Sequence, residues 1–181
     1  MIIRSNSSAV DFALLKDGKL IELNTEIEDN KFSVGDIFVA KIRKSVSGLN
    51  ASFLNVGHQK DGFLHYHDLG PKLLSVIKYI KLVSAGKFNN YLLKNFRYEN
   101  EIEKNGKIED LLKPKQSVLV QIVKEPISTK GPRLSSEISL AGRFMILIPF
   151  SNRVSISQKI LNINEKKRLK KLVSSIRPKG F

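Results

Sequence analysis

Three short segments between residues 38 and 65 alternate apolar and polar side chains, and this alternation restricts the fold of the chain more than any other feature of its sequence. The segments cover residues 38–43, 52–56 and 62–65. Successive side chains of a β-strand point to opposite faces of a sheet, so the pattern predicts strands with one buried face. Short strands separated by turn residues predict a compact β architecture, and 181 residues suffice for one large domain or two small ones.

The alternation also assigns the side chains to two faces. The set expected inside the fold is Phe38, Ala40, Ile42, Leu54, Val56 and Leu64. The set expected on the opposite faces is Lys41, Arg43, Phe53, Asn55, Phe63 and His65. The second set suits single-stranded RNA, because bases stack on aromatic rings while cations contact phosphates. Alternation alone is equally compatible with the converse arrangement, in which both Phe rings are inside. It also leaves His65 as an ordinary structural histidine and the two cations as solvated strand residues.

A basic loop follows residues 117–123, the segment with the clearest strand pattern. The loop contains Pro126, Gly131 and Pro132. Its cations are Lys124, Lys130 and Arg133. Cationic side chains in such a loop can contact phosphates, and glycine lets the backbone approach a ligand closely. Lys124 and Lys130 are therefore candidate RNA-binding residues. The alternative is a basic surface loop that is stiffened by its prolines.

The remaining segments predict further strands and two helical regions. Residues 2–27 are expected to form two strands joined by a tight turn at residues 16–19. Residues 70–107 repeat apolar side chains near helical spacing and carry eight Lys and Arg against three Glu, 8 − 3 = +5, which predicts a partly helical insertion. Residues 133–149 contain two extended stretches, and a basic helix is expected to begin with Asn164 as its N-cap.

Charge and residue usage narrow the functional classes. The chain has 31 Lys and Arg against 17 Asp and Glu, a net charge of +14, which favours nucleic acid as a partner and an anionic membrane surface second. It has no Cys, its three His are scattered, and its carboxylates form no pattern for catalysis or metal binding. We therefore assign no catalytic or metal-ligating residue and expect no cofactor in this chain. No apolar run reaches the roughly 18–20 residues of a membrane span, and the first residues lack a signal-peptide pattern, so we expect a cytoplasmic protein without a membrane partner.

Several of these motifs resemble the ribonuclease E/G family. The similar stretches are residues 2–27, 34–38, 50–57, 61–64, 124–134 and 138–144. The first stretch resembles the opening strands of the family's RNase H-like subdomain, the next three resemble its S1 domain, and the last two resemble the return from one to the other. The likeness covers nearly the whole chain except residues 70–107, and Ala40 stands where the family often has Gly.

The resemblance implies a fold that is mainly β with some α. In this fold a five-stranded S1-type OB-fold barrel is inserted into the start of an RNase H-like subdomain. The implied S1 domain covers residues 34–126 and contains the insertion. The RNase H-like subdomain is expected to contribute residues 1–33 before the barrel, and residues 127–181, with the basic helix, after it.

The resemblance also implies a function, the binding of single-stranded RNA by the N-terminal part of a homo-oligomeric endoribonuclease that acts in the processing and decay of rRNA and mRNA. The family's RNA contacts correspond to Phe53, Phe63 and Lys130, with Lys124 as a weaker addition. The family's Mg²⁺-binding aspartates, the Arg-Thr pair that senses an RNA 5′-monophosphate and the zinc-linking cysteines are expected beyond Phe181. The alternative is a free-standing S1-type module that acts in translation or ribosome assembly. A compact nuclease is disfavoured, because the chain lacks clustered carboxylates.

Overall fold

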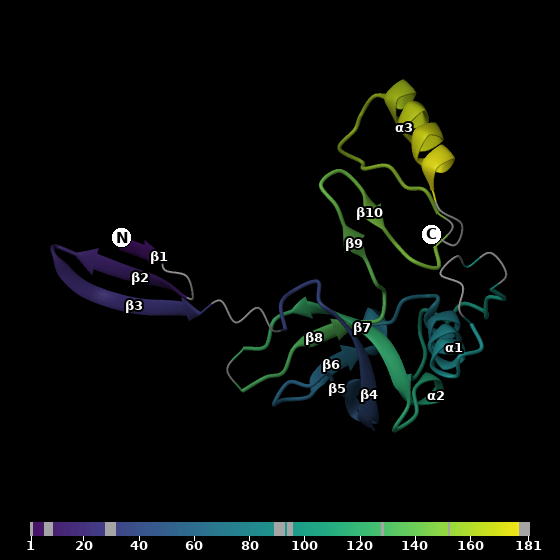
Figure 1. The fold of residues 1–181 in the computed structure, drawn as a ribbon, viewed down its shortest axis with the longest axis horizontal. Coiled ribbons are helices and arrows are strands. Elements are labelled where there is room, and N and C mark those ends of the chain that lie inside the picture. Colours follow the sequence, from purple (N-terminus) through teal and green to yellow (C-terminus); the bar gives the residue numbers. More distant parts are fainter. Residues whose placement is uncertain are drawn as a thin grey trace. The chain divides into compact units, whose positions relative to one another are not determined.

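A computed structural model of the chain describes residues 2–5, 9–27, 32–88, 93, 96–127, 129–151 and 153–177. The chain divides into two compact units, Met1–Lys31 and Phe32–Phe181. The first unit is a small sheet, and the second contains a closed five-stranded barrel, a two-stranded sheet and the helices (Figure 1). The prediction of a mainly β chain with some helix is therefore confirmed.

The first unit is a three-stranded antiparallel sheet in the order β1-β2-β3. Its strands are Ile2–Ser5 (β1), Ala9–Lys16 (β2) and Lys19–Ile27 (β3). The predicted tight turn is confirmed, because Asp17 and Gly18 both have positive φ, of 51° and 76°, as a two-residue hairpin turn requires. The prediction of two strands is wrong, because Ile2–Ser5 is a separate strand that pairs antiparallel with β2.

Five strands of the second unit close into a barrel in the order β4-β5-β6-β8-β7. They are Ile37–Val46 (β4), Ala51–Asn55 (β5), Gly62–His65 (β6), Ser117–Lys124 (β7) and Arg133–Ser135 (β8). Four of the five pairings are antiparallel, and the pairing of β6 with β8 is parallel. The barrel strands thus continue to Ser135, past the boundary that we expected at residue 126, so part of the segment assigned to the outer subdomain is a barrel strand.

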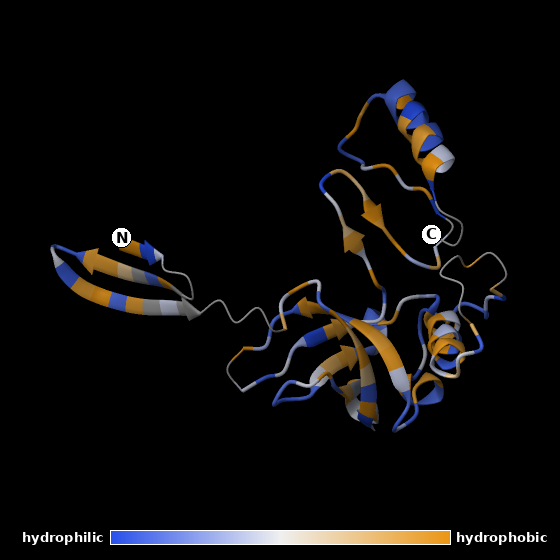
Figure 2. Ribbon diagram, in the orientation of Figure 1, coloured by the Kyte–Doolittle hydropathy of each residue, from blue (hydrophilic) through white to orange (hydrophobic). Residues whose placement is uncertain are grey.

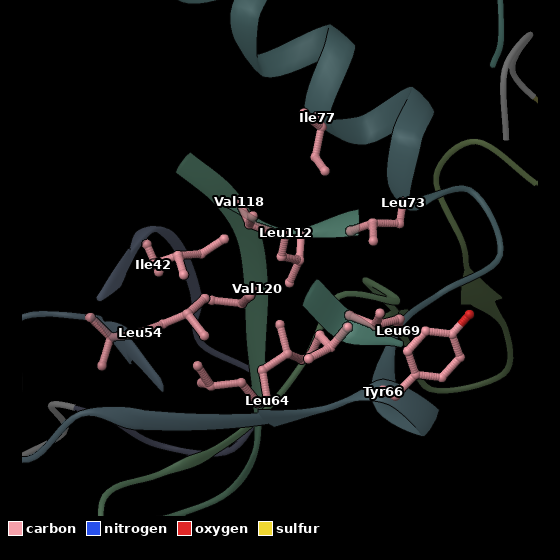
Figure 3. Close-up of a cluster of buried hydrophobic side chains, with 14 of the residues drawn as sticks. Ile42, Leu54, Leu64, Tyr66, Leu69, Leu73, Ile77, Leu112, Val118 and Val120 are labelled. Carbon is pink, nitrogen blue, oxygen red and sulfur yellow. The ribbon is translucent and has the colours of Figure 1, made fainter. Parts of the chain in front are cut away.

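The barrel interior contains most of the apolar set that the alternation predicts, together with apolar residues of β7 and β8. Its fully buried members are Ala40, Ile42, Leu54, Leu64, Val118, Val120, Ile122 and Leu134. Figure 3 shows several of these side chains pointing into one cluster. Val56 is also buried, whereas Phe38 is half-buried and packs against Phe32 with ring centres 5.6 Å apart. Because Leu54 and Leu64 are inside, the converse arrangement is excluded.

The insertion is partly helical, as predicted, and belongs to the core of the second unit. Helix α1 covers Leu73–Ser84 and the short helix α2 covers Ile108–Leu111. Leu73 and Ile77 join the barrel cluster, and both point into it in Figure 3. Val76 and Ile80 of α1 belong to a second apolar cluster. The other buried members of this cluster are Leu93, Phe96 and Phe150. The insertion therefore packs against the barrel through apolar side chains.

The residues after the barrel form a two-stranded sheet and a helix. The strands are Leu140–Ala141 (β9) and Ile146–Leu147 (β10), and the helix is Ile163–Ile176 (α3). The predicted basic helix is confirmed, but the predicted N-cap is wrong. The N-cap is Asn162, whose Oδ1 accepts hydrogen bonds from the backbone N–H groups of Asn164 and Glu165 at 2.9 and 3.1 Å. Asn162 has the extended backbone of a cap, whereas Asn164 already lies within the first turn. The predicted RNase H-like subdomain, formed by segments before and after the barrel, stays a prediction.

Candidate nucleic-acid interface

Strands β5 and β6 expose a line of aromatic rings on the outside of the barrel. The centres of the Phe53 and Phe63 rings are 5.7 Å apart, and the two rings meet edge to face. The line continues along β6 to His65, 6.4 Å from Phe63, and then to His67, 5.1 Å from His65. Phe53, Phe63 and His65 are half-buried, so each presents part of its ring to solvent. The outward position that the alternation assigned to these three residues is thus observed.

A β-bulge in β4 decides which cation lies beside the Phe53 ring. Ile42 is opposite Leu54 and Lys44 is opposite Phe53, so Arg43 is the additional residue of the bulge. The Lys44 ammonium lies 5.3 Å from the centre of the Phe53 ring, within cation–π distance. Lys44 therefore lies beside the Phe53 ring. Simple alternation of side chains along β4 does not predict this placement of Lys44.

The two cations that the sequence proposed on β4 have other surroundings. Arg43 Nε lies 3.1 Å from Asp61 Oδ1, so the guanidinium already has an anionic partner. Lys41 is exposed and lies opposite Asn55 and Ser117. Neither residue lines the groove described below.

The strand register places five side chains in one row across the barrel. Lys44 is opposite Phe53, Phe53 is opposite Phe63, Phe63 is opposite Arg133, and Arg133 is opposite Lys124. A second bulge, between Ile122 and Lys124, brings Lys124 into this register. We call these five residues the cross-strand row. It places two aromatic rings between cations, the combination that single-stranded nucleic acid requires.

A groove of about 660 Å³ lies along part of the cross-strand row. It is lined by Phe53, Lys60, Asp61, Phe63, Lys124, Glu125, Ile127, Thr129, Lys130, Gly131 and Arg133. Four lining residues are cationic and two are anionic, so the side chains that line the groove carry a net positive charge. Two of the lining residues, Phe53 and Phe63, are aromatic. Four of the predicted RNA-binding residues, Phe53, Phe63, Lys124 and Lys130, are brought together here. His65 flanks the groove through its contact with Phe63.

Close backbone packing fixes the loop that carries Lys130. Ile127 and Lys130 exchange backbone hydrogen bonds of 3.1 and 2.9 Å, which hold the tip of the loop. Phe63 N donates to Pro132 O at 2.8 Å. A Cβ atom on Gly131 would lie only 2.1 Å from the backbone oxygen of Asp61, so glycine is required for this approach. The close approach at Gly131 is therefore to the chain's own backbone, whereas the predicted approach to a ligand stays a prediction.

Two polar contacts orient the side chains at the edge of the groove. Arg133 Nε and one terminal nitrogen donate to the two carboxylate oxygens of Asp68 at 3.0 and 3.1 Å, and this hydrogen bonding together with the charge of Asp68 raises the pKa of Arg133. His65 Nδ1 accepts a hydrogen bond from His67 N at 3.1 Å. In the neutral imidazole the proton of His65 is therefore on Nε2, which acts as a donor.

In the described part of the chain, several carboxylates form ion pairs and none belongs to a metal-binding cluster. Among these residues, no group of three or more His, Asp and Glu is placed to hold a metal ion. Several carboxylates are instead paired with cations, including Asp61, Asp68, Glu99 and Glu101.

No helix within the described ranges is long and apolar enough to cross a membrane.

The sequence interpretation missed Lys44, Lys60 and Ile127. Lys44 was missed because a bulge reverses the alternation on which the interpretation relied. Lys60 and Ile127 lie outside the strands and line the groove only through the folding of their loops. The bulge leaves no clear signal in a single sequence.

Comparisons with known proteins found similarity to ribonucleases over most of this chain. Residues 139–181 match the model of the ribonuclease E/G family. Ribonuclease E of a Nostoc species is 35% identical over 149 residues, which are 82% of this chain and 18% of that protein. A ribonuclease E/G-like protein of Pyropia yezoensis is 35% identical over 92% of this chain and 27% of its own length. Ribonuclease G of Escherichia coli is 28% identical over 96% of this chain and 32% of its own length.

These relatives are much longer than the segment they share with this chain, which spans between 18% and 32% of their lengths. The matches nevertheless include the barrel and the segment after it, because they extend over most of the 181 residues. The chain belongs to the ribonuclease E/G family and is homologous, over most of its length, to the N-terminal region of its members.

Proposed function

We propose that the barrel is an S1-type RNA-binding domain of the OB-fold class and that it binds single-stranded RNA for an endoribonuclease. The observation that carries this proposal is the cross-strand row, in which Phe53 and Phe63 lie between Lys44 on one side and Arg133 and Lys124 on the other. Rings of this kind stack on bases of any sequence, and the flanking lysines neutralise the phosphates.

The geometry of the two rings determines how the strand is held. Because Phe53 and Phe63 meet edge to face at an interplanar angle of 66°, two bases cannot continue one stack over both rings. Each ring therefore receives a separate base, and the RNA strand is unstacked between them. Lys130 at the loop tip and Lys124 at the end of β7 contact phosphates on one side of the groove, and Lys44 contacts a phosphate on the other.

The relatives' names support a wider proposal for the complete protein. We propose that it is a Mg²⁺-dependent endoribonuclease of rRNA and mRNA that acts as a homo-oligomer in the cytoplasm. The barrel is then inserted into an RNase H-like subdomain, to which residues 1–33 and residues after Ser135 contribute. The described residues do not fit a Mg²⁺ site, because no cluster of carboxylates occurs among them. The role of this chain is to hold RNA, and the metal chemistry belongs to another part of the protein.

The test measures RNA affinity and stability on the same variants. Phe53→Ala and Phe63→Ala should each weaken the binding of a fluorescent oligouridylate by about 1–3 kcal/mol, which is the value of one base–aromatic stack. The matched control is Phe144→Ala, since Phe144 is 85% exposed, has Arg143 at 5.1 Å from its ring and lies outside the groove. The control should retain wild-type affinity.

Thermal unfolding separates the binding role from a role in the core. An Ala substitution of a core Phe costs about 3–5 kcal/mol of stability. The half-buried Phe53 and Phe63 should lose clearly less than this. Variants that unfold easily but bind RNA normally in their folded fraction would refute the proposed binding surface.

A further inference from the structure

The positive charge of the chain is concentrated in its last segment. Residues 151–181 contain nine Lys and Arg and a single acidic residue, Glu165, so they contribute 9 − 1 = +8 of the total of +14. Five of these cations lie within two turns of helix α3, at residues 166–171. None of these five residues lines the groove of the barrel.

The helix places four of these cations on one side. Lys166 and Lys170 are four residues apart, as are Lys167 and Lys171, so each pair lies on adjacent turns of the same side. The apolar residues of α3 occupy the other side and are Leu169, Leu172, Val173 and Ile176. In Figure 2, which colours the ribbon by residue hydropathy, α3 contains both blue (hydrophilic) and orange (hydrophobic) segments. We call Lys166, Lys167, Lys170 and Lys171 the lysine face.

Arg168 does not belong to the lysine face, because Glu165 neutralises it. Its Nε and one terminal nitrogen donate to the two carboxylate oxygens of Glu165 at 2.8 and 2.7 Å. Glu165 is the single carboxylate of residues 151–181, so it is used by this pair. Within the described ranges, no ion pair joins a carboxylate to any residue of the lysine face.

Exposure makes the lysine face available to a partner. Lys167, Lys170 and Lys171 are exposed, Lys166 is half-buried, and the helix has no fully buried residue. Like charges four residues apart destabilise a helix, so a partner that supplies closely spaced anions stabilises α3. The phosphates of a nucleic acid strand are such a series of anions, and lysine ammonium groups contact them without reading the bases.

We propose that the lysine face of α3 is a second RNA-binding surface, which holds phosphates of a single strand outside the barrel groove. The membership of the chain in the ribonuclease E/G family favours RNA over a lipid headgroup surface as the occupant of the lysine face. The inference shares with the proposed function only the identity of the ligand, single-stranded RNA.

The test compares two variants that lose the same charge. The first carries Lys166→Gln, Lys167→Gln, Lys170→Gln and Lys171→Gln, which preserve helix propensity. The control carries Lys16→Gln, Lys19→Gln, Lys113→Gln and Lys115→Gln at four exposed positions that are outside α3 and do not line the groove. The probe is an oligouridylate of about 30 nucleotides, longer than the roughly 4–16 nucleotides that one OB-fold occupies. Anisotropy titrations at several salt concentrations give the slope of log affinity against log salt.

The slope should become shallower by about 0.7 for each lost phosphate contact, up to roughly 2.8 for the lysine-face variant. The control should keep the wild-type slope, and circular dichroism should show that both variants retain their helix. Equal slopes for the two variants would overturn the inference. Sedimentation with phosphatidylserine vesicles gives a second measurement, and loss of vesicle binding in the lysine-face variant without a change of RNA slope would also overturn it.

Phe53→Ala in the same assay separates this inference from the proposed function. If Phe53→Ala binds normally and the lysine-face variant has a shallower slope, the barrel proposal fails and the second surface stands. If Phe53→Ala binds weakly and the lysine-face slope equals the control slope, the second surface fails and the barrel proposal stands.

Discussion

Arg43 and Lys44 are neighbours in the sequence, and the bulge in β4 gives them different surroundings. The Arg43 guanidinium is paired with Asp61, while the Lys44 ammonium lies over the Phe53 ring at the end of the cross-strand row. A cation beside a base-stacking ring is placed to meet the phosphate of the stacked nucleotide. We therefore expect Lys44 to contribute more to RNA binding than Arg43.

The corresponding variants are Lys44→Gln and Arg43→Gln, which remove one positive charge each. Lys44→Gln should lower the slope of log affinity against log salt by about 0.7, the value for one single-strand phosphate contact. Arg43→Gln should leave that slope unchanged and cost about 0–1 kcal/mol of stability, because its ion pair with Asp61 is largely exposed. A larger slope change for Arg43→Gln than for Lys44→Gln would contradict the assignment.

Residue-level prediction from the sequence succeeded where the strand period was unbroken. A period of two separated Phe53 and Phe63 from Leu54 and Leu64, and the structure then showed which pair lies inside the barrel. Lys44 could not be placed, because one additional residue in the ladder shifts every later side chain to the other face.

Among the elements, helix α1 packs against the apolar core of the barrel. Ile77 is only 5% exposed and joins the barrel cluster, whereas Val83 on the same helix is 44% exposed. Ile77→Ala should therefore cost about 2–5 kcal/mol of unfolding free energy. Val83→Ala should stay within about 0.5 kcal/mol, as substitutions away from the core do. Chemical denaturation of both variants measures the difference, and equal losses would show that α1 packs only loosely.

Element boundaries were harder to predict than element types. The strands, the helical insertion and the basic helix follow from apolar periodicity, which is a local property. Arg133–Ser135 pairs antiparallel with the neighbouring β7, but it closes the barrel through a parallel pairing with β6, and no local pattern reports a partner so distant in the sequence. The cap at Asn162 was missed because Asn162 and Asn164 both lie near the start of the helix and only the backbone conformation selects one of them.

For the whole molecule, the arrangement of charges predicts binding without cleavage. We expect the 181-residue chain to bind single-stranded RNA and to leave it intact in the presence of Mg²⁺, because no cluster of carboxylates occurs among the described residues. Incubation with end-labelled RNA followed by a denaturing gel measures this directly. Mg²⁺-dependent cleavage that copurifies with the chain through several columns would contradict the prediction.

The parallel closure between β6 and β8 has a consequence for synthesis on the ribosome. Strand β6 is made early, but its partner β8 follows only after the whole insertion and β7. Translation at roughly 5–20 residues per second therefore leaves one edge of β6 unpaired for several seconds. An open strand edge is a template for pairing with other chains, so the nascent protein passes through an interval in which it is vulnerable to aggregation. That interval ends when residues 133–135 leave the ribosome and close the barrel.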